Sequence, residues 1–217
     1  MNATYVLTGD EKIPAQVTLN GNTTPVWIQS EWTDGEYAEF VQRNGCGHCC
    51  TAMALNLHGI KINPHEEYAL CRKMWGAPQG DKEQGNWASA PGIVKILASF
   101  GVNAECFGVP AGECRKAAEH ITECLKKGKQ VILWSKPSDK LVPNPFSTGD
   151  HYVLLVDIDE NGQILVANSS RKGTTDNGIQ FTDVDIIEAV VPEESEPQDC
   201  TWGTYYLNHC GGYIIVG

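Results

Sequence analysis

Apolar residues in the first part of the chain recur with the period of a helix. Cys49, Met53 and Leu57, for example, are four residues apart and so share one helical face. Farther on, Asn63 and Pro64 have the side chains that cap a helix and fill its first turn. Patterns of this kind predict helices at about residues 46–59, 63–76, 93–101 and 112–127.

After Gly128 the apolar residues form short runs that are rich in valine, isoleucine, leucine and tyrosine. Such runs are typical of β-strands. They predict strands over residues 130–135, 151–158, 164–168, 186–191 and 213–216. Because the helices come first and the strands follow, the chain is predicted to have an α+β fold with helices packed on an antiparallel sheet. The order argues against an alternating dinucleotide-binding fold.

The length of 217 residues favours one domain. We therefore interpret residues 1–217 as a single domain with a helical half, about residues 1–128, and a sheet half, about residues 129–217. Within the helical half, the first 45 residues and the segment 76–92 contain glycines and prolines without helical periodicity. Both segments are predicted to be loops.

The charge balance argues against two classes of partner. The chain has 16 basic and 27 acidic residues, which gives a formal net charge of −11. Nucleic acids and anionic membranes attract basic surfaces. We therefore expect neither a nucleic acid nor a membrane as a partner.

The cysteines and the N-terminal residues predict a location. The start of the chain has neither the basic region nor the apolar run of a signal peptide, and the longest strongly apolar run, residues 153–156, is too short to span a membrane. Nine cysteines at irregular spacing cannot all pair. These features predict reduced thiols and a cytoplasmic protein.

The segment Asn-Gly-Cys-Gly-His-Cys-Cys, residues 44–50, contains the strongest candidate for chemistry. Its first cysteine, Cys46, lies between two glycines at the start of a predicted helix. Unpaired N–H groups and the helix dipole favour a thiolate there, and the glycines let the backbone approach a substrate closely. These features predict a nucleophile, which requires a base from elsewhere in the chain.

Two other interpretations of this segment remain open. Cys46 and Cys49 have the CxxC spacing of a thiol-disulfide oxidoreductase, although that motif normally follows an apolar strand and this one follows Asn44-Gly45. A metal site is the other alternative, although structural zinc sites show two well-spaced ligand pairs. Its soft ligands would be Cys46, His48, Cys49, Cys50, Cys200 and Cys210. We expect neither a metal nor an organic cofactor.

His151 is the best candidate for the base. It opens an apolar strand that does not need a histidine at its first position. His48 is two residues after Cys46 and points to the other side of the helix. His58 lies about 18 Å farther along the helix axis. Neither of these two histidines is therefore expected to activate the cysteine.

The hairpin that follows the histidine predicts its orienting partner. A four-residue turn at residues 159–162 places Ile158 opposite Gln163, and therefore Asn168 opposite Val153. Asn168 then lies on the same face as the histidine, about 7 Å away between backbones. A two-residue turn would place the asparagine too far away, so a catalytic pair requires the longer turn.

An asparagine at this place can accept a hydrogen bond from the imidazole and so set its tautomer. Asp150 and Asp157 are the alternative orienting residues. Asp150 is the neighbour of His151 on the strand and should point away from it, so Asn168 is preferred.

A cysteine that opens a helix, followed by a histidine and an asparagine on strands, is the arrangement of papain-like cysteine peptidases. Residues 45–47, Gly-Cys-Gly, with Thr-Ala-Met-Ala-Leu at 51–55, resemble the helix of bacterial double-glycine leader (bacteriocin-processing) peptidases and their stand-alone relatives. Residues 149–162 resemble their histidine strand and turn. Residues 166–169, Val-Ala-Asn-Ser, fall where those peptidases commonly have Val-Asn-Asp-Pro. The resemblance covers residues 25–170.

The resemblance implies a papain-like α+β fold and roles for four residues. Cys46 would be the nucleophile, His151 the base and then the acid, and Asn168 the orienting residue. The family also places a glutamine upstream of the cysteine to donate to the oxyanion. Gln29 matches this position, and Gln42 is the alternative.

The chain departs from the family pattern at two places. His48 and Cys49 replace the usual proline and its neighbour, and Asn168 and Ser169 replace the usual Asp-Pro pair. An asparagine can still orient a histidine, but it supports an imidazolium less than a carboxylate does.

We predict from these residues a cysteine peptidase that hydrolyses a peptide or isopeptide bond through a thioester, with a peptide or protein as its substrate. The same residues would also serve an amidase, a transglutaminase or an acyltransferase. Two alternatives belong to other classes. An oxidoreductase requires both Cys46 and Cys49, whereas a binding module on an inactive scaffold requires none of the catalytic residues.

Overall fold

A computed structural model describes residues 2–75, 90–109, 113–135, 146–147, 151–170, 180–181 and 212–217 of the chain. Five α-helices are described in this part of the chain: α1 (Ala38–Asn44), α2 (Cys46–Leu57), α3 (Pro64–Trp75), α5 (Ala90–Ser99) and α6 (Cys114–Lys126). A short 3₁₀ helix, η1 (Gln29–Glu31), precedes them. None of the described helices has the length and apolarity that would let it cross a membrane.

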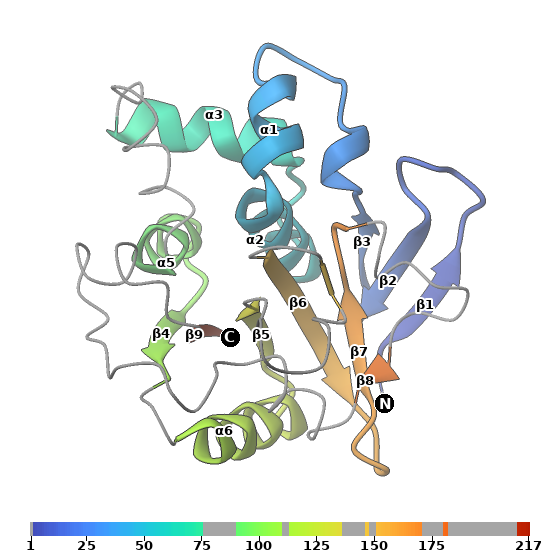
Figure 1. Ribbon diagram of the computed structural model, residues 1–217, viewed down its shortest axis with the longest axis vertical. Coiled ribbons are helices and arrows are strands. Elements are labelled where there is room, and N and C mark those ends of the chain that lie inside the picture. Colours follow the sequence, from blue (N-terminus) through green and yellow to red (C-terminus); the bar gives the residue numbers. More distant parts are fainter. Residues whose placement is uncertain are drawn as a thin grey trace.

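The strands form two antiparallel sheets (Figure 1). The first sheet contains β1 (Thr4–Leu7), β2 (Ala15–Leu19) and β3 (Asn22–Val26) in chain order. The second has the strand order β4-β9-β5-β6-β7-β8. Its members are β4 (Ala104–Gly108), β5 (Gln130–Ser135), β6 (His151–Ile158), β7 (Ile164–Ala167), β8 (Gln180–Phe181) and β9 (Gly212–Val216).

The α+β fold is confirmed, and the four predicted helices are present with small differences at their ends. Strands β5 and β6 have the predicted bounds, and β7 and β9 each differ from the prediction by one residue. The predicted strand 186–191 and residues 76–89 of the predicted loop 76–92 lie outside the described residues. The last three residues of that predicted loop, 90–92, instead form the first turn of α5. Strand β4, between two predicted helices, was not predicted.

The prediction of a loop over the first 45 residues is wrong, because this segment contains the first sheet, η1 and α1. The sequence does carry the signal of the missed hairpin. In β2 the side chains of Ala15, Val17 and Leu19 alternate with polar ones and are buried. Asn20 and Gly21 follow, both with positive φ, and form the two-residue turn that Asn-Gly favours.

The six-stranded sheet has a hydrophobic core on each face. On β6, Leu154 and Val156 belong to the core that contains α2 and α5, whereas Val153 and Leu155 belong to the core that contains α6. Figure 1 shows α2 and α6 on opposite sides of this sheet. Burial on both faces explains why the strands are almost continuously apolar instead of alternating.

The first sheet contacts the rest of the described structure through β3 and through the chain start. Strand β3 packs against α2. At the chain start, the backbone N–H groups of Asn2 and Ala3 donate to the carboxylate of Asp157, which is buried on β6. Asp157 therefore anchors the N-terminal sheet and does not orient His151.

The junction between α1 and α2 requires a glycine. Gly45 has a φ of −83°, which any residue can adopt. A Cβ at this position, however, would lie 2.3 Å from the carbonyl oxygen of Val41 and 2.7 Å from its Cγ1. The glycine before Cys46 therefore allows two helices to follow one another across a single residue.

We expect Gly45→Ala to lower the free energy of unfolding by about 2 kcal/mol, because the backbone of α1 cannot move away from the added methyl group. Urea titration with a circular dichroism readout measures this change. Gly101→Ala is the matched control. Gly101 has a φ of +76° and open space around it, so alanine there costs about 1 kcal/mol through backbone strain alone. A smaller loss for Gly45→Ala than for Gly101→Ala would contradict the steric explanation.

Candidate active site

Cys46 occupies the first position of α2 and is the accessible end of a buried helix. The N–H group of Cys49 donates to the carbonyl of Gly45 at 2.8 Å, which closes the first turn. Every residue of α2 from Gly47 to Leu57 is buried, whereas Cys46 is partly exposed. The first N–H groups of a helix lack intrahelical acceptors, so a thiolate here would lie at the positive end of the helix dipole.

His151 and Asn168 are in direct contact. The imidazole Nε2 of His151 and Oδ1 of Asn168 are 2.8 Å apart, and the two residues are 4% and 2% exposed. His151 opens β6, and Asn168 directly follows β7, the strand paired with β6. Helix α2 packs against β6, so the strand that begins with His151 lies against the helix that begins with Cys46 (Figure 1).

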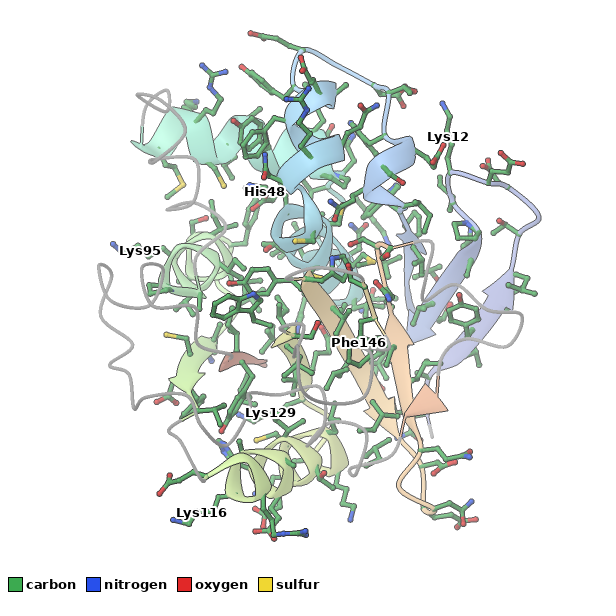
Figure 2. The ribbon with its side chains drawn as sticks, in the orientation of Figure 1. Lys12, His48, Lys95, Lys116, Lys129 and Phe146 are labelled. Atoms are coloured by element: carbon green, nitrogen blue, oxygen red, sulfur yellow. The ribbon has the colours of Figure 1, made fainter. Side chains whose placement is uncertain are left out.

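The neighbours of Asn168 assign its amide and, through it, the histidine tautomer. Its Nδ2 lies 3.0 Å from the carbonyl oxygen of Phe146, which only accepts, and its Oδ1 lies 2.9 Å from the N–H of Ser170, which only donates. Oδ1 is therefore the atom that faces His151, and Nε2 of His151 must carry the hydrogen. The second ring nitrogen, Nδ1, is then the basic one. Figure 2 shows Phe146 beside β6 and β7.

Burial lowers the pKa of His151 from its usual value of 6.5 to about 4, and the hydrogen bond to Asn168 opposes part of this shift. The imidazole is consequently neutral near pH 7. A neutral ring with a fixed Nε2–H can accept a proton at Nδ1, which is what a general base requires.

The hairpin of β6 and β7 has a different turn from the predicted one, but its far end has the predicted pairing. Ile158 pairs with Ile164 and not with Gln163, so the turn is one residue longer than the four residues predicted. A bulge between Leu155 and Asp157 then shifts the register. Beyond the bulge Leu154 pairs with Ala167. In the same register Asn168, which follows Ala167, lies level with Val153, as predicted. A bulge adds one residue to a strand, so it compensates for the longer turn.

Gln29 lies between the segment after β7 and the end of α1. Its N–H donates to the carbonyl of Ser169 at 2.9 Å, and its Nε2 donates to the carbonyl of Gln42 at 3.3 Å. One hydrogen of this amide therefore remains for another acceptor. The amide of Gln42 instead donates to the carbonyl of Trp32 at 2.7 Å. Asp150, the other predicted alternative near His151, lies outside the described residues.

Three buried side chains, those of His48, Glu67 and Cys71, form a polar cluster that is not among the predicted sites. His48 Nδ1 contacts Glu67 Oε2, and the Cys71 thiol donates to Glu67 Oε1 at 3.4 Å. The spacing of Glu67 and Cys71, four residues apart on α3, could have indicated that they share one helical face. The cluster shares only His48 with the metal site considered from the sequence, and Cys200 and Cys210 lie outside the described residues.

Cys49, the second cysteine of the CxxC spacing, lies inside α2. Burial is the main cause of the raised pKa of the Cys49 thiol, which is fully buried one helical turn after Cys46.

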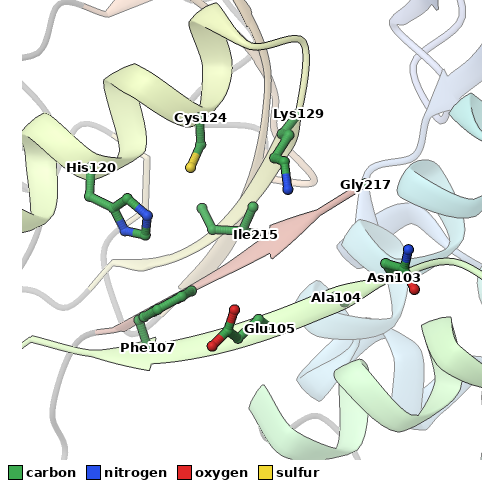
Figure 3. A pocket seen from close by; sticks show the side chains of 9 residues that line it. All are labelled: Asn103, Ala104, Glu105, Phe107, His120, Cys124, Lys129, Ile215 and Gly217. Atoms are coloured by element: carbon green, nitrogen blue, oxygen red, sulfur yellow. The ribbon is translucent and has the colours of Figure 1, made fainter.

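A separate pocket of about 230 Å³ lies between α6 and the β4–β9 pair, where His120, Phe107 and Lys129 are among the lining residues (Figure 3). It contains none of the predicted site residues.

Comparisons with known proteins identify the relatives of this chain. The model of a family described as Peptidase_C39 like matches residues 24–186. Among solved structures, the chain is similar to a double glycine motif protease from an AMS/PCAT transporter in complex with the leader peptide. That match has 12% identity and a TM-score of 0.41, and covers 79% of this chain and 83% of that one. No curated protein matches the sequence significantly. The family match confirms the resemblance drawn from the sequence.

The low pKa of His151 predicts a specific loss of stability in acid. In the unfolded chain the ring protonates near pH 6.5, whereas in the folded protein it protonates only near pH 4. The stability that comes from burying the neutral ring is therefore complete above pH 6.5 and is lost as the pH falls towards 4, by about 3 kcal/mol in total. Urea unfolding of the wild type and of His151→Gln between pH 7 and 4 isolates this contribution. Parallel stability curves for the two proteins would refute it.

Proposed function

Because the chain belongs to the Peptidase_C39-like family, we propose that it is a cysteine peptidase that hydrolyses a peptide or isopeptide bond with Cys46 as the nucleophile. The observation that carries this proposal is the 2.8 Å contact between His151 and Asn168, which leaves Nδ1 of a neutral histidine as the base. The partly exposed thiol of Cys46 at the start of α2 is the nucleophile that this base would activate.

The first half of the reaction forms a thioester. His151 Nδ1 takes the proton of the Cys46 thiol, and the sulfur attacks the carbonyl carbon of the scissile bond. The negative charge that develops on the carbonyl oxygen is stabilised by N–H groups at the start of α2 and by the remaining amide hydrogen of Gln29. The imidazolium then gives its proton to the leaving amine as the carbon–nitrogen bond breaks.

Water completes the cycle. His151 Nδ1 takes a proton from a water molecule, the hydroxide attacks the thioester, and the carbon–sulfur bond breaks to release a carboxylic acid. The proton returns to the thiolate of Cys46. Throughout, Asn168 keeps Nε2 protonated, so Nδ1 is the nitrogen that exchanges protons.

The proposal predicts a reactive thiol at Cys46. Its alkylation by iodoacetamide, mapped by mass spectrometry as a function of pH, should show an apparent pKa well below the ordinary thiol value of ~8.5. His151→Ala should raise this apparent pKa, because the thiolate loses the imidazolium that forms when Nδ1 of His151 takes the thiol proton. Cys49→Ser is the matched control and should leave the profile unchanged. An effect of Cys49→Ser without an effect of His151→Ala would favour the oxidoreductase, and an inert Cys46 would favour a binding module.

Two further variants test the supporting roles on any peptide that a library screen identifies as a substrate. Asn168→Ala should lower kcat about 10- to 100-fold, because the histidine loses its fixed tautomer. Gln29→Ala should lower kcat at least 100-fold with little change in KM, because the oxyanion forms only after attack. Gln42→Ala serves as the control. A larger effect on kcat from Gln42→Ala than from Gln29→Ala would reverse the assignment of the oxyanion donor.

A further inference from the structure

A buried polar cluster joins the first turn of α2 to α3. We call His48, Glu67 and Cys71 the Glu67 cluster. Its three members are at most 1% exposed. One carboxylate oxygen of Glu67 contacts His48 Nδ1, and the other accepts the hydrogen bond of the Cys71 thiol at 3.4 Å. His48, labelled in Figure 2, is two positions after Cys46 in the first turn of α2, so the cluster is anchored close in the chain to the proposed nucleophile.

Aromatic rings close the cluster off from solvent. The ring of His48 lies edge-on to Phe40 and Tyr68, with centroids 5.8 and 5.0 Å away. Phe40 and Tyr68 stack on each other with centroids 4.2 Å apart. Phe40 belongs to α1 and Tyr68 to α3, so the histidine of α2 is held where these three helices meet. Such rings cannot replace the hydrogen bonds that water would give a carboxylate.

The hydrogen-bond partners assign the donating nitrogen of His48. Its Nε2 is buried and has no partner among the described residues, whereas its Nδ1 contacts Glu67. A bare lone pair costs less in such a place than an unsatisfied N–H group. Nδ1 of His48 is therefore the nitrogen that donates to Glu67, whereas in His151 it is Nε2 that donates, to Asn168.

Both carboxylate oxygens of Glu67 have hydrogen-bond partners inside the cluster. His48, Glu67 and Cys71 are donor types that bind zinc, and their ligand atoms lie within 4.8 Å of one another. Each carboxylate oxygen, however, already faces a hydrogen, from His48 or from Cys71. Within the described residues Glu67 has no Lys or Arg partner, so these two hydrogens are what keep the carboxylate in place.

We propose that Glu67 is a positioning residue of the active site: by accepting the hydrogen bond of His48 it holds the first turn of α2, and with it Cys46, in the orientation that catalysis needs. This role rests on the proposed function. The physical basis is that N–H groups at a helix start stabilise a thiolate only while the first turn stays formed and aligned. Only Gly47 lies between His48, whose side chain is anchored, and Cys46.

The charge of Glu67 acts in the opposite direction to this anchoring. Burial is the main cause of the raised pKa values of the Cys49 and Cys71 thiols; the charge of Glu67 contributes next for Cys71, and after that of Cys46 for Cys49. A residue that acted on Cys46 through its negative charge alone would hold the pKa of that thiol high, and its removal would lower it. A positioning residue has the reverse effect, because its removal loosens the helix start. The sign of the shift therefore separates the two roles.

The experiment is the pH profile of Cys46 alkylation by iodoacetamide in the full chain. We expect Glu67→Ala to raise the apparent pKa of Cys46 by roughly one unit. Glu67→Gln keeps an acceptor oxygen for His48 and should restore the wild-type profile to within a few tenths of a unit. Glu66→Gln is the matched control, because Glu66 is the exposed neighbour of Glu67 and its side chain accepts a hydrogen bond from the N–H of Asn63 at the start of α3. It should match the wild type.

Other outcomes overturn the proposal. A fall in the apparent pKa for both Glu67→Ala and Glu67→Gln would show an effect of charge alone, and a wild-type profile in Glu67→Ala would show no role. Stoichiometric zinc in the purified wild type, lost in Cys71→Ser, would replace the hydrogen-bonded cluster with a metal site. An ordinary wild-type pKa near 8.5 would refute the proposed function, and the role of Glu67 with it.

Folding is controlled in the same samples. Near-ultraviolet circular dichroism and the thermal midpoint report whether Glu67→Ala retains its packing. If it does not fold, His48→Ala and His48→Asn provide the same comparison, because the Asn amide can donate from about the place of Nδ1. The proposal then requires a raised pKa of Cys46 in His48→Ala and its restoration in His48→Asn. Equal profiles in these two variants would overturn it.

Discussion

The burial of α2 on all sides is the constraint on which the rest of the structure depends. A helix that is buried from its second residue onwards needs neighbours all around it, and β3, β6, α3 and α5 supply them. Its only accessible residue is then the first one, Cys46. The same arrangement puts the proposed nucleophile at the end of the helix where unpaired N–H groups favour an anion.

Two buried histidines near α2 each have a hydrogen-bond acceptor inside the core. His151 donates to the amide of Asn168, and His48 donates to the carboxylate of Glu67. The arrangements are opposite, with Nε2 donating in His151 and Nδ1 in His48. The first leaves a basic nitrogen for proton transfer, and the second uses its hydrogen to join two helices. Identical side chains thus have different tasks because of the acceptors placed beside them.

Several elements could be predicted because their signals are local. The apolar runs of β5 and β6 have clear polar or glycine boundaries, and the Asn63 cap with Glu66 defines the start of α3. The Asn-Gly turn of the β2–β3 hairpin is equally local, but the glycines and prolines scattered around it are also typical of a loop. Strand β4 carries no such local signal. It forms because β9, more than a hundred residues later, pairs with it.

The sequence by itself determined the α+β class, the helix that Cys46 opens and the candidate pair His151 and Asn168. These depend on local periodicity, on capping and on a hairpin of short range. Only the tertiary structure decided the bulge on β6 that brings Asn168 level with Val153, and the pairing of His48 with Glu67. A bulge depends on how one strand pairs with its neighbour, and a buried carboxylate takes whichever donor the packing of two helices brings to it. Neither depends on nearest neighbours in the chain, so neither can be read from the sequence alone.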